Sequence, residues 1–125
     1  MKIAVVVVRT LMGLLFLFAS VVVLFKLVPQ PEQTGNVKLF MDGVNATGYL
    51  MTLIKVTELV CGLAFVTGLF VPLAVVVIAP ITINIFFFHL FVDTNGLPVA
   101  IFLVLANAFL GYANWNKYKP MLAMK

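Results

Sequence analysis

The chain has 125 residues, of which 64% are hydrophobic and only 10% are charged, and its net charge is +4. A soluble globular domain is roughly 45–50% apolar and about 25% charged, so this composition excludes an ordinary cytosolic enzyme, a disordered chain and a nucleic-acid-binding protein. The single cysteine, Cys61, and the single histidine, His89, exclude an intrachain disulfide, a Cys-x-x-Cys motif and a bis-histidine haem site within one chain.

Four apolar segments are long enough to cross a bilayer, which takes about 20 mostly apolar residues in a helix. They lack the alternation of apolar and polar residues that is typical of barrel strands, so we expect helices. The predicted spans run from about 3–28, 49–70, 73–92 and 97–115. Together they form a single transmembrane domain over residues 1–125, whose main partner is the lipid bilayer.

Turn-forming residues separate the spans. Pro29-Gln30-Pro31 follows the first, Gly68 to Pro72 joins the second to the third, and Asp93-Thr94-Asn95-Gly96 joins the third to the fourth. Short connections make consecutive helices antiparallel neighbours. The predicted fold class is therefore all-α: a transmembrane four-helix bundle with up-down-up-down topology.

The connection between the first two spans contains a short amphipathic helix at about 33–45. Val37, Phe40, Met41 and Val44 recur at the spacing i, i+3, i+4 and i+7, which places them on one helical face. We expect this helix to lie on the outer surface, against the bundle or among lipid headgroups. A short loop helix that only fills space is the alternative.

The basic residues predict the orientation, because Lys and Arg are in excess on the cytoplasmic side of membrane proteins. Lys2 and Arg9 lie near the N-terminus, and Lys117, Lys119 and Lys125 lie in the C-terminal tail. An even number of spans puts both termini on one side. We therefore expect both termini to be cytoplasmic.

Several polar residues are expected at membrane depth, where they are costly and usually face a partner or a cavity. At a rise of about 1.5 Å per residue, Glu58, Asn84 and Asn107 lie near the midplane, with Lys26, Lys55 and His89 closer to the outer surface. We predict an outward-facing polar pocket for a ligand. The six candidate ligand-binding residues are Lys26, Lys55, Glu58, Asn84, His89 and Asn107.

Structural roles compete with this interpretation. Lys55 and Glu58, at i and i+3, can form an ion pair that fixes the position of their helix, while Gly62 on the same face lets a neighbouring helix approach. Asn84 and Asn107 can serve as hydrogen bonds between helices. His89 can cap the bundle, and Lys26 can extend to the membrane surface. No cluster of residues predicts a metal site.

The chain resembles the DoxX family of small four-helix membrane proteins over roughly residues 1–118. The matching motifs are Arg9-x3-Gly13-Leu-Leu-Phe16 and Lys26-Leu27; Thr47-Gly48-Tyr49-Leu50; Glu58-Leu59-x2-Gly62-Leu63, Gly68 and Pro72-Leu73-Ala74; and Pro80, Asn84 and His89. The resemblance implies a quinone-linked or oxidative-stress membrane role in a prokaryotic inner membrane, since the family is named for a subunit linked to thiosulfate:quinone oxidoreduction and a terminal quinol oxidase. By position, Lys26, Glu58 and His89 are the residues to which that role carries over.

Three functions follow as hypotheses. The first is a redox subunit or accessory protein that binds a quinone or another apolar molecule, with Glu58 as the proton donor. The second is a scaffold that holds a lipid or anchors a soluble redox enzyme at the cytoplasmic face through Lys117, Lys119 and Lys125. The third is a small proton-coupled transporter that uses Glu58. Whether the chain catalyses a reaction itself stays open.

Overall fold

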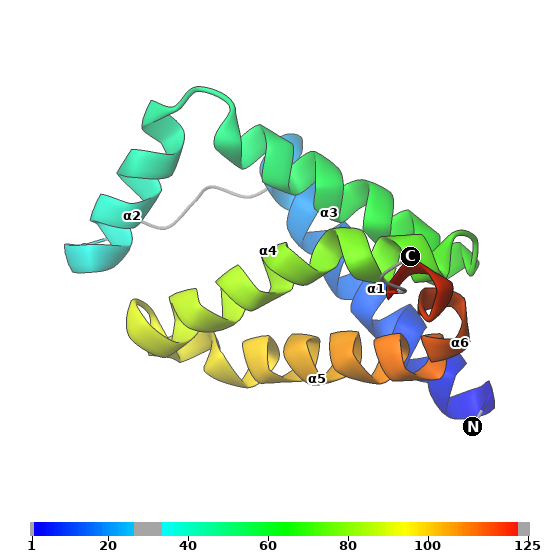
Figure 1. The fold of residues 1–125 in the computed structure, drawn as a ribbon. Coiled ribbons are helices and arrows are strands. Elements are labelled where there is room, and N and C mark those ends of the chain that lie inside the picture. The colour runs from blue at the N-terminus through cyan, green and yellow to red at the C-terminus, as the bar shows by residue number, and fades with distance from the viewer. Residues whose placement is uncertain (1, 27–33, 123–125) are drawn as a thin grey trace.

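The computed structural model describes residues 2–26 and 34–122, and every regular element in these ranges is a helix (Figure 1). The elements are α1 (Lys2–Leu24), α2 (Gly35–Ala46), α3 (Leu50–Thr67), α4 (Val71–Phe91), α5 (Leu97–Ala113) and α6 (Trp115–Tyr118), with 3-10 turns at Thr94–Gly96 and Pro120–Leu122. Within the described ranges, four helical segments are long and apolar enough to cross a membrane: α1, α3, α4, and α5 together with the 3-10 turn that precedes it. This confirms the four predicted helices. The predicted end of the first span and Pro29-Gln30-Pro31 lie outside the described residues.

The four long helices pack as two pairs, α1 with α3 and α4 with α5. Consecutive long helices run in opposite directions in Figure 1. The two pairs meet at the end of the bundle that carries Lys2 and α6, which we call the terminal end. They diverge toward the other end, which we call the α2 end because α2 stands over it (Figure 1).

Two glycines hold α1 and α3 in close contact. A Cβ atom at Gly13 would lie 2.9 Å from the carbonyl oxygen of Gly62, and one at Gly62 would lie 3.1 Å from the carbonyl oxygen of Gly13. The backbones therefore touch where these residues cross. Small residues at helix crossings allow this approach in membranes, where van der Waals packing drives helix association, and the predicted role of Gly62 is confirmed.

A three-residue connection joins α3 to α4. Gly68 ends α3 in the left-handed conformation (φ +79°), and its amide donates to the carbonyl of Ala64 at 2.9 Å. Pro72 follows in the first turn of α4, where the missing amide hydrogen costs little. The guanidinium group of Arg9 packs directly against Gly68, so this basic side chain lies beside the C-terminal end of α3, where the helix dipole favours a positive charge.

The tightly packed core lies where the two pairs meet. It includes the fully buried side chains of Met12, Phe65, Ile78 and Leu110. Tyr118 anchors the C-terminal segment to this core. Its side chain is 8% exposed, and its hydroxyl group donates a hydrogen bond to the carbonyl of Pro72 at 2.8 Å. The terminal end is therefore the closed end of the bundle.

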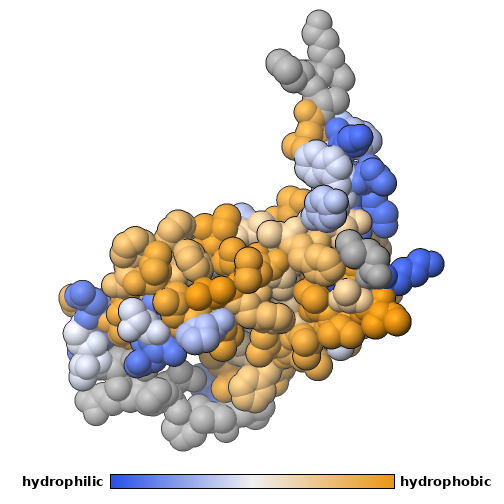
Figure 2. All heavy atoms as spheres, turned by 90° about the horizontal axis from the view of Figure 1, so that it is seen from below, coloured by the Kyte–Doolittle hydropathy of each residue, from blue (hydrophilic) through white to orange (hydrophobic). Residues whose placement is uncertain are grey.

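The molecular surface is apolar along the helices and hydrophilic toward its ends. Figure 2 shows a broad apolar region, with hydrophilic residues gathered at the left end and on the segment that projects at the upper right. All four long helices expose large apolar side chains, among them Leu14, Val60, Leu73 and Leu105. Such a surface suits contact with lipid and would be costly in water.

A short helix, α2 (Gly35–Ala46), lies where the sequence predicts one at about 33–45. It begins after Thr34, and residue 33 lies outside the described residues. Its predicted apolar face is turned toward the bundle: Val44 is buried, and Val37 and Met41 are half-buried. Phe40 packs against Phe88 of α4, with ring centroids 4.7 Å apart. α2 therefore covers the open end between the two pairs.

Candidate functional site

A cavity of about 500 Å³ lies at the α2 end, between the two diverging helix pairs. Ligand-binding cavities usually measure about 300–1,000 Å³ and have mostly apolar walls with a few polar groups, and this cavity fits that description. Helices α1 to α5 all contribute to its walls. Its polar side chains are those of Asn45, Lys55, Glu58, Asn84 and His89.

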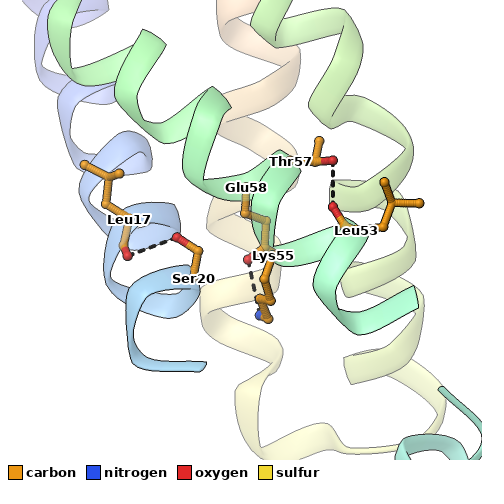
Figure 3. Close-up of polar contacts among 6 residues, drawn as sticks. All are labelled: Leu17, Ser20, Leu53, Lys55, Thr57 and Glu58. Atoms are coloured by element: carbon orange, nitrogen blue, oxygen red, sulfur yellow. Dashed lines mark hydrogen bonds and ion pairs between the residues drawn. The ribbon is translucent and has the colours of Figure 1, made fainter. Parts of the chain in front are cut away.

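The α3 wall carries an ion pair. Lys55 Nζ lies 3.2 Å from Glu58 Oε2, and the spacing i, i+3 puts both residues on one face of the helix. Figure 3 shows the two side chains leaving α3 together, whereas Thr57 points away and donates to the carbonyl of Leu53 at 2.8 Å. Glu58 is only 2% exposed, so Lys55 supplies the positive charge that makes a carboxylate at this depth tolerable.

The opposite wall, from α4, carries Asn84 and His89. The two residues are five apart, about 140° around an ideal helix, so a narrow pocket could not be bordered by both. The divergence of α3 from α4 makes the cavity wide enough for both side chains to line it. His89 is half-buried, and its Nδ1 lies 2.9 Å from the backbone carbonyl oxygen of Asp93.

Two of the six predicted ligand-binding residues, Lys26 and Asn107, are not among the residues that line the cavity. Lys26 is exposed just beyond the end of α1, in the left-handed backbone conformation (φ +53°). Asn107 of α5 donates from Nδ2 to the carbonyl of Val75 at 3.4 Å and so ties α5 to α4. Asn107 thus has the interhelical hydrogen bond that competes with a ligand-binding role. The cavity brings together the other four: Lys55, Glu58, Asn84 and His89.

The sequence did not predict that α2 helps to form this cavity. Phe40, Met41, Val44 and Asn45 of α2 line it, and the contact of Phe40 with Phe88 joins α2 to the α4 wall. The apolar stripe of α2 predicts that this face of the helix is buried. The stripe alone does not show whether the face packs against the membrane surface or covers a cavity. The described residues contain no group of three or more His, Cys, Asp or Glu side chains that could hold a metal ion.

Comparison with known proteins gives the family. The sequence model of the DoxX family matches residues 4–90, which cover α1 to α4 almost completely and include the four predicted ligand-binding residues that line the cavity. Searches among curated proteins and among solved structures found no match. The family match and the four long apolar helices agree with each other, and the chain therefore belongs to the DoxX family and is a multi-pass membrane protein.

Proposed function

We propose that this protein binds a quinone, or a similar molecule with an apolar body and a polar head, in the cavity at the α2 end. The protein would serve as a subunit of, or an accessory to, a quinone-linked membrane redox system. The observation that carries the proposal is the combination of mostly apolar walls from five helices with buried Glu58 and its partner Lys55 on one wall and His89 on another.

The groups present fit a quinone head. The ammonium group of Lys55 uses one of its three hydrogen-bond donors on Glu58, and another can serve a quinone carbonyl. Glu58 lies beside it and is the residue that would give or take a proton when the head group changes its redox state. The apolar side chains of α1, α2 and α5 suit the body of the ligand.

The two ends of the molecule favour one orientation. Lys2, Lys117 and Lys119 belong to the terminal end, and all three are exposed. We therefore propose that the terminal end faces the cytoplasm of a prokaryotic cell, where these residues could contact a soluble redox enzyme. Lys125, the third residue of the proposed tail contact, lies outside the described residues.

Quinone binding can be tested by titrating the purified protein in lipid nanodiscs with ubiquinone-1 in a calorimeter. Glu58→Gln and Lys55→Met should each weaken saturable binding by about tenfold or more, because each removes a polar partner of the head group. Lys38→Met and Asp42→Asn make the matching changes in the exposed ion pair of α2 and should leave the affinity unchanged. Binding that does not saturate in the wild type, or that survives both cavity substitutions in folded protein, would refute the proposal.

A bilayer lipid is the second candidate ligand, because the cavity walls are mostly apolar. Native mass spectrometry of gently purified protein separates the two candidates by the mass of any retained molecule. A retained lipid that ubiquinone-1 does not displace would favour the scaffold or lipid-binding role.

A further inference from the structure

A groove of about 510 Å³ lies between α3 and α4 and extends to the connection that joins them. We call it the hairpin groove. Its lining side chains are apolar apart from Cys61 and Thr67, and the hydroxyl group of Thr67 already donates to the carbonyl of Leu63 at 2.7 Å. Val60 and Leu73 belong to the lining and are exposed, so the groove opens on the apolar surface of the molecule. It therefore suits a flexible hydrocarbon chain.

The hairpin groove ends at a membrane surface. A connection between two membrane-spanning helices has to lie at one surface of the bilayer, and Figure 1 shows the connection from α3 to α4 at the terminal end. Leu69 and Phe70 belong to this connection, line the end of the groove and are 62% and 76% exposed. A lipid whose chain fills the groove would therefore have its head group beside this connection.

A cationic group is held at the same connection. The guanidinium group of Arg9 packs against Gly68, whose added Cβ atom would lie 3.1 Å from Arg9 Cζ. The two neighbours of Gly68, Thr67 and Leu69, line the groove. Nε of Arg9 is buried and has no hydrogen-bond partner, and no acidic side chain in the described part of the chain pairs with Arg9. An anion at this point would supply the charge partner that these residues do not provide.

The charges of the described residues are divided between the two ends of the molecule. The terminal end carries four basic residues: Lys2, Arg9, Lys117 and Lys119. The acidic residues in the described ranges lie elsewhere, with Asp42 in α2, Glu58 on the cavity wall and Asp93 in the connection from α4 to α5. The terminal end is therefore complementary in charge to an anionic lipid head group.

We propose that an anionic phospholipid binds at the terminal end, with its phosphate group at Arg9 and one acyl chain in the hairpin groove. An arginine side chain can hold a phosphate group through two parallel hydrogen bonds, and the hydrocarbon chain fits an apolar groove. A phospholipid is the class of ligand that joins these two parts at a membrane surface. The site is separate from the cavity at the α2 end and does not depend on what that cavity binds.

Quenching of tryptophan fluorescence by brominated lipids measures lipid binding at a chosen position of the chain. In a Trp115→Phe background, Leu73→Trp places a reporter in the lining of the hairpin groove. Tyr112→Trp is the control, because Tyr112 is also exposed and near the terminal end but belongs to α5 and is not part of the groove lining. Each protein is reconstituted with brominated phosphatidylglycerol or with brominated phosphatidylcholine that has the same acyl chains.

The preference for phosphatidylglycerol over phosphatidylcholine should be about fivefold greater at position 73 than at position 112, since one basic residue near the membrane surface contributes about that factor. The diffuse attraction of the lysines acts at both positions. Arg9→Gln should reduce the preference at position 73 to the value at position 112. Lys38→Gln removes the same charge from the exposed ion pair of α2 and should leave the preference unchanged.

The outcomes decide between a lipid site and other sources of binding. An equal preference at positions 73 and 112 in the protein that keeps Arg9 refutes the site, and this comparison stands even if Arg9→Gln does not fold. A folded Arg9→Gln variant that keeps the full preference shows that Arg9 does not hold the phosphate group. Inorganic phosphate that abolishes the preference at constant ionic strength identifies the ligand as a free anion and overturns the proposal.

Discussion

The close contact between α1 and α3 leads to the prediction that Gly13→Ala weakens the fold although it adds only one methyl group. The new Cβ atom would lie 2.8 Å from Val66 Cγ2, 2.9 Å from the Gly62 carbonyl oxygen and 3.0 Å from Phe65 Cβ. Ordinary contact begins at 3.4 Å, so the contact with Gly62 is about 0.5 Å too short. The partner there is backbone, and only a separation of the two helices can relieve it.

The expected cost can be stated against a matched control. Overpacking of this kind typically costs about 1–3 kcal/mol, whereas replacing glycine by alanine in a helix gains up to about 1 kcal/mol from lower backbone entropy loss. Gly111→Ala in α5 has the same helical gain without the clash, because its Cβ atom would meet only Val75 Cγ1, at 3.8 Å. The free energy of unfolding should therefore be lower in Gly13→Ala than in Gly111→Ala by about 1–3 kcal/mol.

Equilibrium unfolding in mixed micelles of a mild detergent and dodecyl sulfate, followed by circular dichroism, measures this difference. Both variants need to be compared with the wild type in the same micelles. If Gly13→Ala is as stable as Gly111→Ala, the backbones of α1 and α3 do not touch at Gly13 and Gly62, and the account of how this helix pair forms is wrong.

Two further predictions concern single polar contacts. Tyr118→Phe removes the hydrogen bond to Pro72 and should lower the unfolding free energy by about 1 kcal/mol. Burial raises the pKa of the Tyr118 hydroxyl, so the stability of the wild type should also fall as pH rises above the ordinary tyrosine pKa of about 10. This fall should be smaller in Tyr118→Phe. Lys55→Met leaves Glu58 buried without its partner and should cost about 3 kcal/mol, whereas Lys38→Met in the exposed pair of α2 should cost less than about 1 kcal/mol.

Each of these predictions has a clear opposing result in the same unfolding assay. Equal alkaline sensitivity of wild type and Tyr118→Phe would show that this hydroxyl does not resist deprotonation in the folded protein. Equal stability of the Lys55→Met and Lys38→Met variants would show that Glu58 finds another partner or reaches water.

The sequence predicted the long helices well, because each helix coincides with a run of apolar residues. Such a run can be recognised without knowing which other helices lie beside it. It also predicted the Lys55–Glu58 pair, because a pair at i, i+3 depends only on helix geometry. Gly62 was predicted to allow close packing, but its partner Gly13 was not, since nothing local shows which helix lies opposite.

The composition of the cavity was harder to predict, because it depends on the angle between the two helix pairs. Counting depth along straight helices placed Glu58, Asn84 and Asn107 at one level, but depth does not say which way a side chain faces. Asn107 faces the backbone of α4 and bonds to Val75. Asn84 and His89 share the cavity only because α3 and α4 diverge from the short connection at Gly68.

The position of the ion pair within a single helix has a consequence for how the protein enters the membrane. Because Lys55 and Glu58 are both in α3, they can neutralise each other as soon as that turn has coiled, before α4 and α5 have been synthesised. The segment can therefore leave the insertion machinery as an electrically balanced unit, and the penalty for carrying two charges into lipid is reduced from the start. If the two residues were on different helices, the first charge would be unpaired in the bilayer until the second helix had been inserted.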